Sequence, residues 1–202
     1  MIPSFPYMLK SRLMGKNFLY EFYFKGHRTL DVGCGNGEFL KLAPELIEGF
    51  DLNKEVVRVL KNEGLKASVG DVSNMIYRDG SFPRVHCRNV IEHLFPETAY
   101  KMLKEASRVL TNGGLLILGT EVPTKKFWGT FGHIKPYPPG AIKKLLRDKT
   151  REEFESIDNL KYVGVIYLGQ YYRFKAMYFL SCFLAYYTPL LRREYFIVLR
   201  KH

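Results

Sequence analysis

The sequence predicts an α/β fold with a doubly wound, mostly parallel sheet. Segments with strand character alternate with segments of helical periodicity, which is typical of sheets with helical crossover connections. Residues 115–121 form an apolar run without alternation, as expected for a strand covered on both faces. A glycine-rich turn at residues 33–37 joins a strand pattern to a helical pattern, and sheets of this class build their sites at such turns.

Each element has a local justification. The strand patterns lie at residues 28–32, 46–51, 65–69, 85–94, 115–121, 160–168 and 195–199. The helical patterns lie at residues 37–43, 53–64, 96–110 and 139–147. Asn53 can cap its helix and Gly64 can end it, Pro96 suits a first helical turn, and Pro44 stops the first helix.

Composition favours one intracellular domain. The 202 residues are 47% hydrophobic and 25% charged, which are globular values. Cys34, Cys87 and Cys182 are an odd number and show no CxxC spacing, so we expect a reducing compartment and no disulfide framework. The N-terminus lacks the apolar core of a signal peptide, and no Cys/His cluster indicates a metal. We therefore expect a cytoplasmic protein without a metal.

Positive charge is concentrated at the two flanks. The net charge is +11, with +4 in residues 1–28, −2 in residues 29–121 and +9 in residues 122–202. Basic flanks favour an anionic substrate, an anionic lipid surface or nucleic acid. An ordinary solvated basic surface explains them equally well.

The glycine turn has a specific spacing. Gly33, Gly35 and Gly37 follow Asp31 at every second position, whereas dinucleotide sites need G-x-G-x-x-G/A, and Glu38 stands where the last glycine or alanine would be. The second strand pattern ends in Asp51, whose carboxylate can accept hydrogen bonds from two ribose hydroxyls. These features predict a site for an adenosine-containing cofactor.

The residues 31–37 resemble motif I, D/E-x-G-x-G-x-G, of the class I S-adenosylmethionine (SAM) methyltransferases. The turn D-G-S-F at 79–82, the segment E-H-L at 92–94 and the stretch LKEASRVLTNGGLLIL at 103–118 are also similar to small-molecule, type 11-like members. Pro83 departs from the family, which usually has Asp there, so a loop contact is in doubt. The resemblance covers about residues 28–122.

The resemblance implies a Rossmann-like sheet of seven strands with one antiparallel strand, in three αβα layers. It also implies a methyltransferase (EC 2.1.1.-) that uses SAM and releases S-adenosylhomocysteine. Asp71 would bind the adenine amino group with Val72 beside the ring, and Asn89 would face the methionine moiety. The expected cofactor-binding residues are Asp31, Gly33, Cys34, Gly35, Gly37, Asp51, Leu52, Asp71, Val72 and Asn89.

Three residues are candidate catalytic groups. Glu92 and His93 follow the carboxyl end of the fourth strand pattern, where they could accept a proton. His133 lies in an aromatic loop that in related enzymes often carries a substrate-side histidine. The alternative is that Glu92 and His93 only stabilise their own loop by hydrogen bonds. The loop that carries His133 would then simply be anchored by its aromatic residues.

We expect a single domain, 1–202, in three parts. Residues 1–27 form an N-terminal cover, 28–122 the SAM-binding core, and 123–202 a substrate-side half with an apolar insertion at 174–191. The insertion is short for a membrane span, but its basic ends would suit peripheral contact with the inner membrane surface through 174–193. Ordinary core packing or a dimer face is the alternative, and the oligomeric state is open.

The favoured function is methyl transfer from SAM to a small or lipid-linked acceptor that is anionic or apolar. One alternative is RNA methylation through the basic flanks, although nucleic acid is not favoured as a partner. Another is a SAM-binding or membrane-associating protein without catalysis. The sequence leaves open the acceptor, the methylated atom and the use of a general base.

Overall fold

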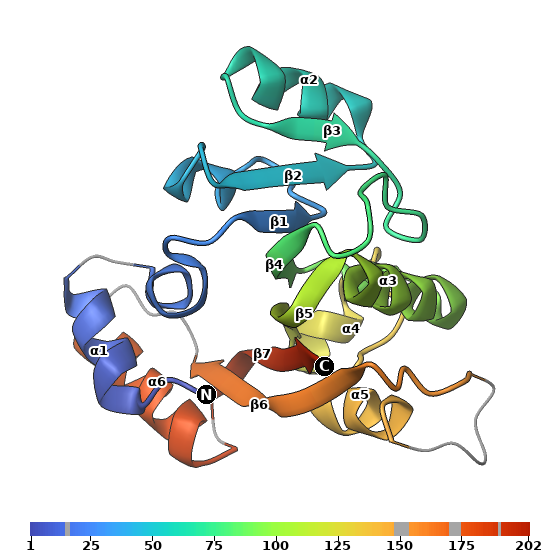
Figure 1. The fold of residues 1–202 in the computed structure, drawn as a ribbon. Coiled ribbons are helices and arrows are strands. Elements are labelled where there is room, and N and C mark those ends of the chain that lie inside the picture. Colours follow the sequence, from blue (N-terminus) through green and yellow to red (C-terminus); the bar gives the residue numbers. More distant parts are fainter. Residues whose placement is uncertain (15–16, 148–153, 170–174, 190) are drawn as a thin grey trace.

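A computed structural model describes residues 1–14, 17–147, 154–169, 175–189 and 191–202. In these ranges a single seven-stranded sheet has the order β3-β2-β1-β4-β5-β7-β6 (Figure 1). The strands are β1 (Thr29–Val32), β2 (Ile47–Asp51), β3 (Ala67–Val69), β4 (Phe82–Arg88), β5 (Leu110–Glu121), β6 (Leu160–Gly169) and β7 (Arg192–Lys201). Strand β7 runs antiparallel to both its neighbours, which confirms the expected mostly parallel sheet with one reversed strand.

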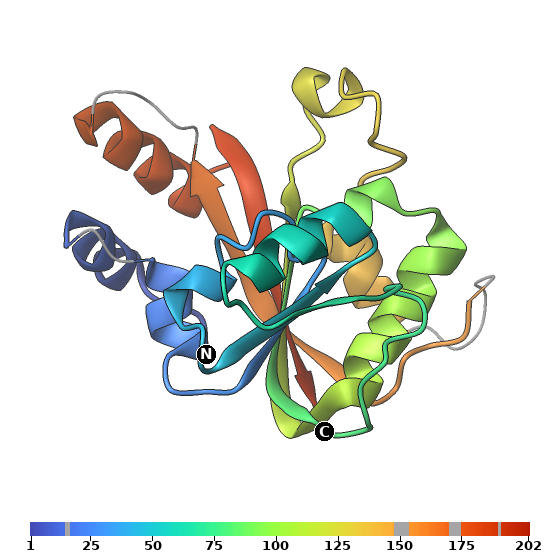
Figure 2. The same cartoon turned by 90° about the horizontal axis from the view of Figure 1, so that it is seen from above.

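Helices cover both faces of the sheet, as Figure 2 shows from above. The α-helices are α1 (Phe5–Leu13), α2 (Lys54–Asn62), α3 (Pro96–Val109), α4 (Lys125–Trp128), α5 (Pro139–Leu145) and α6 (Lys175–Tyr187). The short turns are a π-helix η1 (Tyr20–Phe24) and two 3₁₀ helices, η2 (Leu40–Leu42) and η3 (Ile91–His93). Helices α1 and α6 lie together on one side, and α3 and α5 lie on the other (Figures 1 and 2).

Two main hydrophobic clusters hold these layers together. The larger lies under α3 and α5 and includes Leu103 and Ile142, and the other lies under α1 and η1 around Phe24. A third cluster under α2 joins the second through Phe39, which packs against both. Burial of these apolar side chains is the main favourable contribution to folding.

Several helix signals in the sequence have the expected structural effect. The Asn53 side chain accepts hydrogen bonds from the backbone of Glu55 and Val56 and so caps α2. Pro96 occupies the first turn of α3. The amphipathic pattern of α3 buries Leu103 and Ala106 against the sheet.

The expected helix at residues 37–43 is wrong. The chain forms only turns and the short 3₁₀ helix η2 there, because Pro44 follows too soon for an α-helix to propagate. The fourth strand also ends earlier than its pattern, at Arg88, and Asn89 then turns the chain with a φ of 54°. Positions 174 and 190 of the expected insertion lie outside the described residues.

Candidate active site

The glycine turn, residues 33–37, follows β1 at the carboxyl edge of the sheet. Gly33 and Gly37 have φ angles of 67° and 74°, and a Cβ on either would come within 2.5 Å of a side-chain carbon, of Val90 and Leu60 respectively. The backbone N–H groups of Gly33 and Cys34 both donate to the Phe50 carbonyl of β2, each at 3.0 Å. Glycine is therefore required here both by backbone conformation and by close packing.

Asp51 fixes the middle of the glycine turn from the end of β2. One carboxylate oxygen accepts a hydrogen bond from the Gly35 N–H at 3.0 Å, and the other accepts one from the Asn53 N–H at 2.9 Å. The side chain is only partly buried, so lone pairs remain for a ligand. A Cβ built on Gly35 meets nothing within 4 Å, which leaves open space over the turn.

Asp31 is held by a residue that the sequence analysis missed. The register of β1 against β4 sets Asp31 opposite His86, and His86 Nδ1 lies 2.6 Å from the Asp31 carboxylate. Both side chains are buried. The imidazole also stacks on Phe39 at 3.9 Å between ring centroids and meets the edge of Phe24. A polar residue between two apolar ones, Val85-His86-Cys87, was the signal that could have identified it.

A cavity of about 490 Å³ opens between the glycine turn, β4 and the N-terminal cover. This volume falls in the range of about 300–1,000 Å³ typical of small-molecule sites. The lining residues are Asn17, Leu19, Asp31, Gly33, Cys34, Gly35, Asn36, Glu38, Phe39, Leu42, His86, Arg88 and Asn89.

Charge in the cavity is largely compensated. Arg88 donates two hydrogen bonds to the carboxylate of Glu194, at 2.6 and 3.0 Å. Burial raises the pKa of the Cys34 thiol to about 12, with a further contribution from Asp31 and Asp51. Cys34 is therefore neutral at physiological pH and unsuited to nucleophilic attack.

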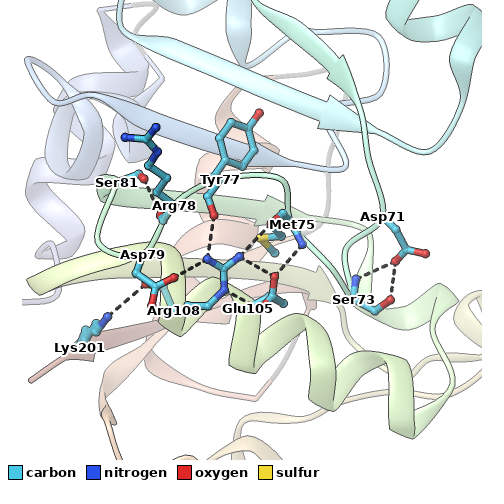
Figure 3. Close-up of polar contacts among 10 residues, drawn as sticks. All are labelled: Asp71, Ser73, Met75, Tyr77, Arg78, Asp79, Ser81, Glu105, Arg108 and Lys201. Atoms are coloured by element: carbon cyan, nitrogen blue, oxygen red, sulfur yellow. Dashed lines mark hydrogen bonds and ion pairs between the residues drawn. The ribbon is translucent and has the colours of Figure 1, made fainter.

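The loop that carries Asp71 is fastened from below by Arg108 of α3 (Figure 3). The Arg108 guanidinium donates to the carbonyls of Tyr77 and Met75 at 2.7 and 2.9 Å and pairs with Asp79 at 2.7 Å. It also pairs with Glu105, whose carboxylate accepts from the Met75 N–H at 2.7 Å. Two residues of the stretch at 103–118 thus stabilise the connection between β3 and β4.

The Asp71 carboxylate accepts hydrogen bonds from the N–H and the hydroxyl of Ser73, both at 2.7 Å (Figure 3). These bonds lower its pKa and keep it ionised. Asp71 and Leu52 are exposed and Val72 is half-buried, and none of the three lines the cavity. Among the expected cofactor residues, the cavity brings together Asp31, Gly33, Cys34, Gly35 and Asn89, whereas Asp51 and Gly37 support the turn.

The three candidate catalytic residues meet beyond the end of β4. Glu92, His93 and His133 each offer one ligand atom, and these atoms lie within 4.8 Å of one another. We call this group the Glu92 cluster. Glu92 lies in η3, and its backbone carbonyl accepts from the Ile134 N–H at 2.8 Å, which ties the loop after α4 to η3.

The two histidines of the Glu92 cluster are oriented by backbone carbonyls. His93 Nδ1 lies 2.7 Å from the Gly132 carbonyl, and His133 Nδ1 lies 3.0 Å from the Phe127 carbonyl. A carbonyl only accepts, so Nδ1 carries the proton in each neutral ring and Nε2 keeps its lone pair. Burial raises the pKa of the Glu92 carboxyl.

Comparisons with known proteins find similarity to methyltransferases. Residues 30–118 match a family model described as a methyltransferase domain. A ubiquinone biosynthesis O-methyltransferase of Xanthomonas oryzae is 34% identical over 105 residues, which are 47% of this chain and 43% of that protein. A probable tRNA methyltransferase 9B of Homo sapiens is 33% identical over 95 residues, 46% of this chain and 21% of that protein.

The chain spans less than half the length of these curated relatives. A solved structure of a SAM-dependent methyltransferase from Archaeoglobus fulgidus has a TM-score of 0.67 and 21% identity, and the match covers 98% of this chain and 95% of that chain. The fold is therefore shared over the whole chain, while sequence similarity is concentrated in the core.

Proposed function

We propose that this chain, a class I SAM-dependent methyltransferase by its core at residues 30–118, methylates an oxygen atom of a small acceptor, free or lipid-linked. The observation that carries the proposal is the Glu92 cluster, in which two imidazoles present Nε2 beside a buried carboxyl group. Asn89, three residues before Glu92, lines the cavity next to the glycine turn. The cluster and the cavity are thus connected through one short loop.

The residues around the cavity fit SAM. The glycine turn leaves room for the amino-acid end of the cofactor, and the Asp51 carboxylate stands where ribose hydroxyls would donate to it. When bound, SAM supplies a methyl group on a sulfonium that is already activated. The chain then has to hold the acceptor atom in line with that methyl group and prevent the acceptor from binding in unproductive orientations.

An oxygen nucleophile explains why this chain would carry the Glu92 cluster. An alcohol or phenol loses its proton as it is methylated, so a nearby group has to favour the ionised oxygen. A neutral amine attacks without prior ionisation. Two histidines held by carbonyls beside a buried carboxyl group suit the first case, because each keeps a free lone pair on Nε2 and the three side chains lie close together.

The test is transfer of labelled methyl groups from SAM to fractionated metabolite, lipid and RNA extracts of the source cell, followed by mass spectrometry of the product. We expect a methyl ether or ester. His93→Ala and His133→Ala should each lower turnover about 100-fold, the low end for loss of acid–base assistance, with SAM affinity retained. His202→Ala, an exposed histidine elsewhere, is the control. Full activity in both variants, or N-methylated products, would contradict the proposal.

RNA methylation is the second candidate, because relatives named as tRNA methyltransferases match the core and residues 122–202 carry a net charge of +9. Phosphate contacts would make binding fall steeply with salt. Methylation of purified tRNA that declines between 50 and 200 mM salt would favour it. Salt-insensitive transfer to an isolated metabolite would exclude it.

We also propose that α6 rests on an anionic lipid surface. Met177, Leu180, Phe183 and Tyr187 are exposed at helical spacing, and Phe5 of α1 packs edge-on against Phe183. Exposed Arg193 follows the helix. No helix in the described ranges has both the length and the apolar character to cross a bilayer, so the contact would be peripheral.

A further inference from the structure

Glu92 is buried in a way that is costly for a carboxyl group. Its relative exposure is 0%, and neither carboxylate oxygen has a hydrogen-bond partner of ordinary geometry, although the Thr120 hydroxyl lies close enough to oppose the rise in the pKa of the Glu92 carboxyl. The hydroxyls of Thr120 and Tyr195, on paired positions of β5 and β7, are also buried and unpartnered. Buried polar groups in native proteins are nearly always satisfied, so this concentration of unpaired oxygens indicates a missing ligand.

The histidines supply the complementary half of such a site. His93 is exposed and His133 is half-buried, so a ligand can approach from the solvent side. Each Nδ1 faces a backbone carbonyl, which is the arrangement that orients metal-binding histidines and fixes their tautomer. Each ring therefore presents Nε2, the nitrogen that would bind a cation.

We infer that the Glu92 cluster binds one divalent transition-metal ion through the Glu92 carboxylate and the Nε2 atoms of His93 and His133. Two imidazoles and one carboxylate suit Zn²⁺ and similar ions better than Mg²⁺ or Ca²⁺, which prefer oxygen ligands. The ion would compensate the buried carboxylate, and a fourth position would stay open to solvent or to an oxygen ligand.

The ligand atoms are near the spacing that this requires. One ring nitrogen of each histidine and one carboxylate oxygen lie within 4.8 Å of one another, and tetrahedral zinc with bonds of about 2.0–2.1 Å places its ligands about 3.4 Å apart. His93 and His133 are far apart in the sequence, so no spacing motif could show the site.

One consequence rests on the proposed function. An acceptor hydroxyl bound at the open position would have a lowered pKa, because the cation stabilises the oxyanion. The O–H bond breaks and its proton goes to solvent, and the oxygen keeps the electron pair for the methyl group. In this arrangement the metal ion stabilises the ionised acceptor oxygen, and no free imidazole is needed as a base.

The test is a calorimetric titration of the chelator-treated full chain with Zn²⁺, repeated with Co²⁺ for its visible absorption. We expect one ion per chain, with at least tenfold weaker binding in His93→Ala and in His133→Ala. His202→Ala should bind as the parent does. Both cluster histidines reach the surface, so these variants should fold, which thermal unfolding verifies, and Glu92→Gln is a third variant that keeps the buried shape.

Absence of stoichiometric binding would overturn the inference, as would equal affinity in the parent, His93→Ala and His133→Ala. These measurements need neither SAM nor acceptor. If the ion fails to bind while the histidine variants lose turnover, the proposed O-methylation stands and the imidazoles act directly as bases. If the ion binds but only amines are methylated, the site stands and the proposed function fails.

Discussion

The proposed cofactor side and the proposed acceptor side of this molecule are built differently. On the cofactor side, the glycine turn is tied to β2 by backbone hydrogen bonds to Phe50 and by the Gly35 N–H, which donates to the Asp51 carboxylate. On the acceptor side, the Glu92 cluster forms where η3 meets the loop after α4, and α1 and α6 come together from opposite ends of the chain (Figure 1). The first side is specified by short motifs at the ends of two adjacent strands, and the second by contacts between segments that are distant in the sequence.

The largest effect is expected at the buried pair beneath the cofactor cavity. His86→Ala leaves the Asp31 carboxylate buried without its partner, and such a loss costs about 3 kcal/mol. We expect the free energy of unfolding in urea to fall by that amount. His27→Ala, at an exposed histidine, should change it little. Equal stability of the two variants would show that Asp31 does not depend on His86.

The next effect concerns the glycine turn. Asp51→Ala removes the acceptor for the Gly35 and Asn53 N–H groups and the proposed ribose contacts. With charge-assisted hydrogen bonds worth about 1.5–3 kcal/mol each, SAM affinity should fall at least about 100-fold by calorimetry. Glu45→Ala, at an exposed acid, serves as the control. Unchanged affinity would place the cofactor elsewhere.

A smaller effect is expected at the Glu105–Arg108 pair, which supports the loop between β3 and β4. Hydrogen bonding to Arg108 holds the pKa of Glu105 below its ordinary value, so this contribution to stability is present above about pH 4.3 and is lost as pH falls through the folded-state pKa. Glu105→Gln should cost about 1–2 kcal/mol at pH 7. In urea unfolding the gap should narrow as the pH is lowered towards 3. A pH-independent gap would indicate a packing effect instead.

The smallest effect tests the acceptor side. Leu180→Asp places a charge on the exposed stripe of α6 and should weaken binding to anionic vesicles severalfold, since burial of apolar area drives such contacts. Val59→Asp, at an exposed apolar position of α2, is the matched control. Vesicle sedimentation at fixed salt measures both. Equal binding of the two variants would show that α6 is not the surface that contacts lipid.

Much of the cofactor side could be predicted from the sequence. Motif I, the acid at the end of the second strand and the helix over 96–110 depend on local conformation and short-range periodicity, which the sequence carries directly. The seven-stranded, mostly parallel sheet with one reversed strand followed from the resemblance and is confirmed. The helix at 37–43 was wrong because local propensity did not account for the few residues available before Pro44.

By itself, the sequence determined the glycine turn, since the positive φ angles at positions 33, 35 and 37 favour glycine and depend on only a few neighbouring residues. Only the tertiary structure decided what surrounds it. The register of β1 against β4 paired Asp31 with His86, and the loop after α4 brought His133 to Glu92 and His93. Contacts between distant segments depend on packing of the whole sheet, and no local pattern encodes them.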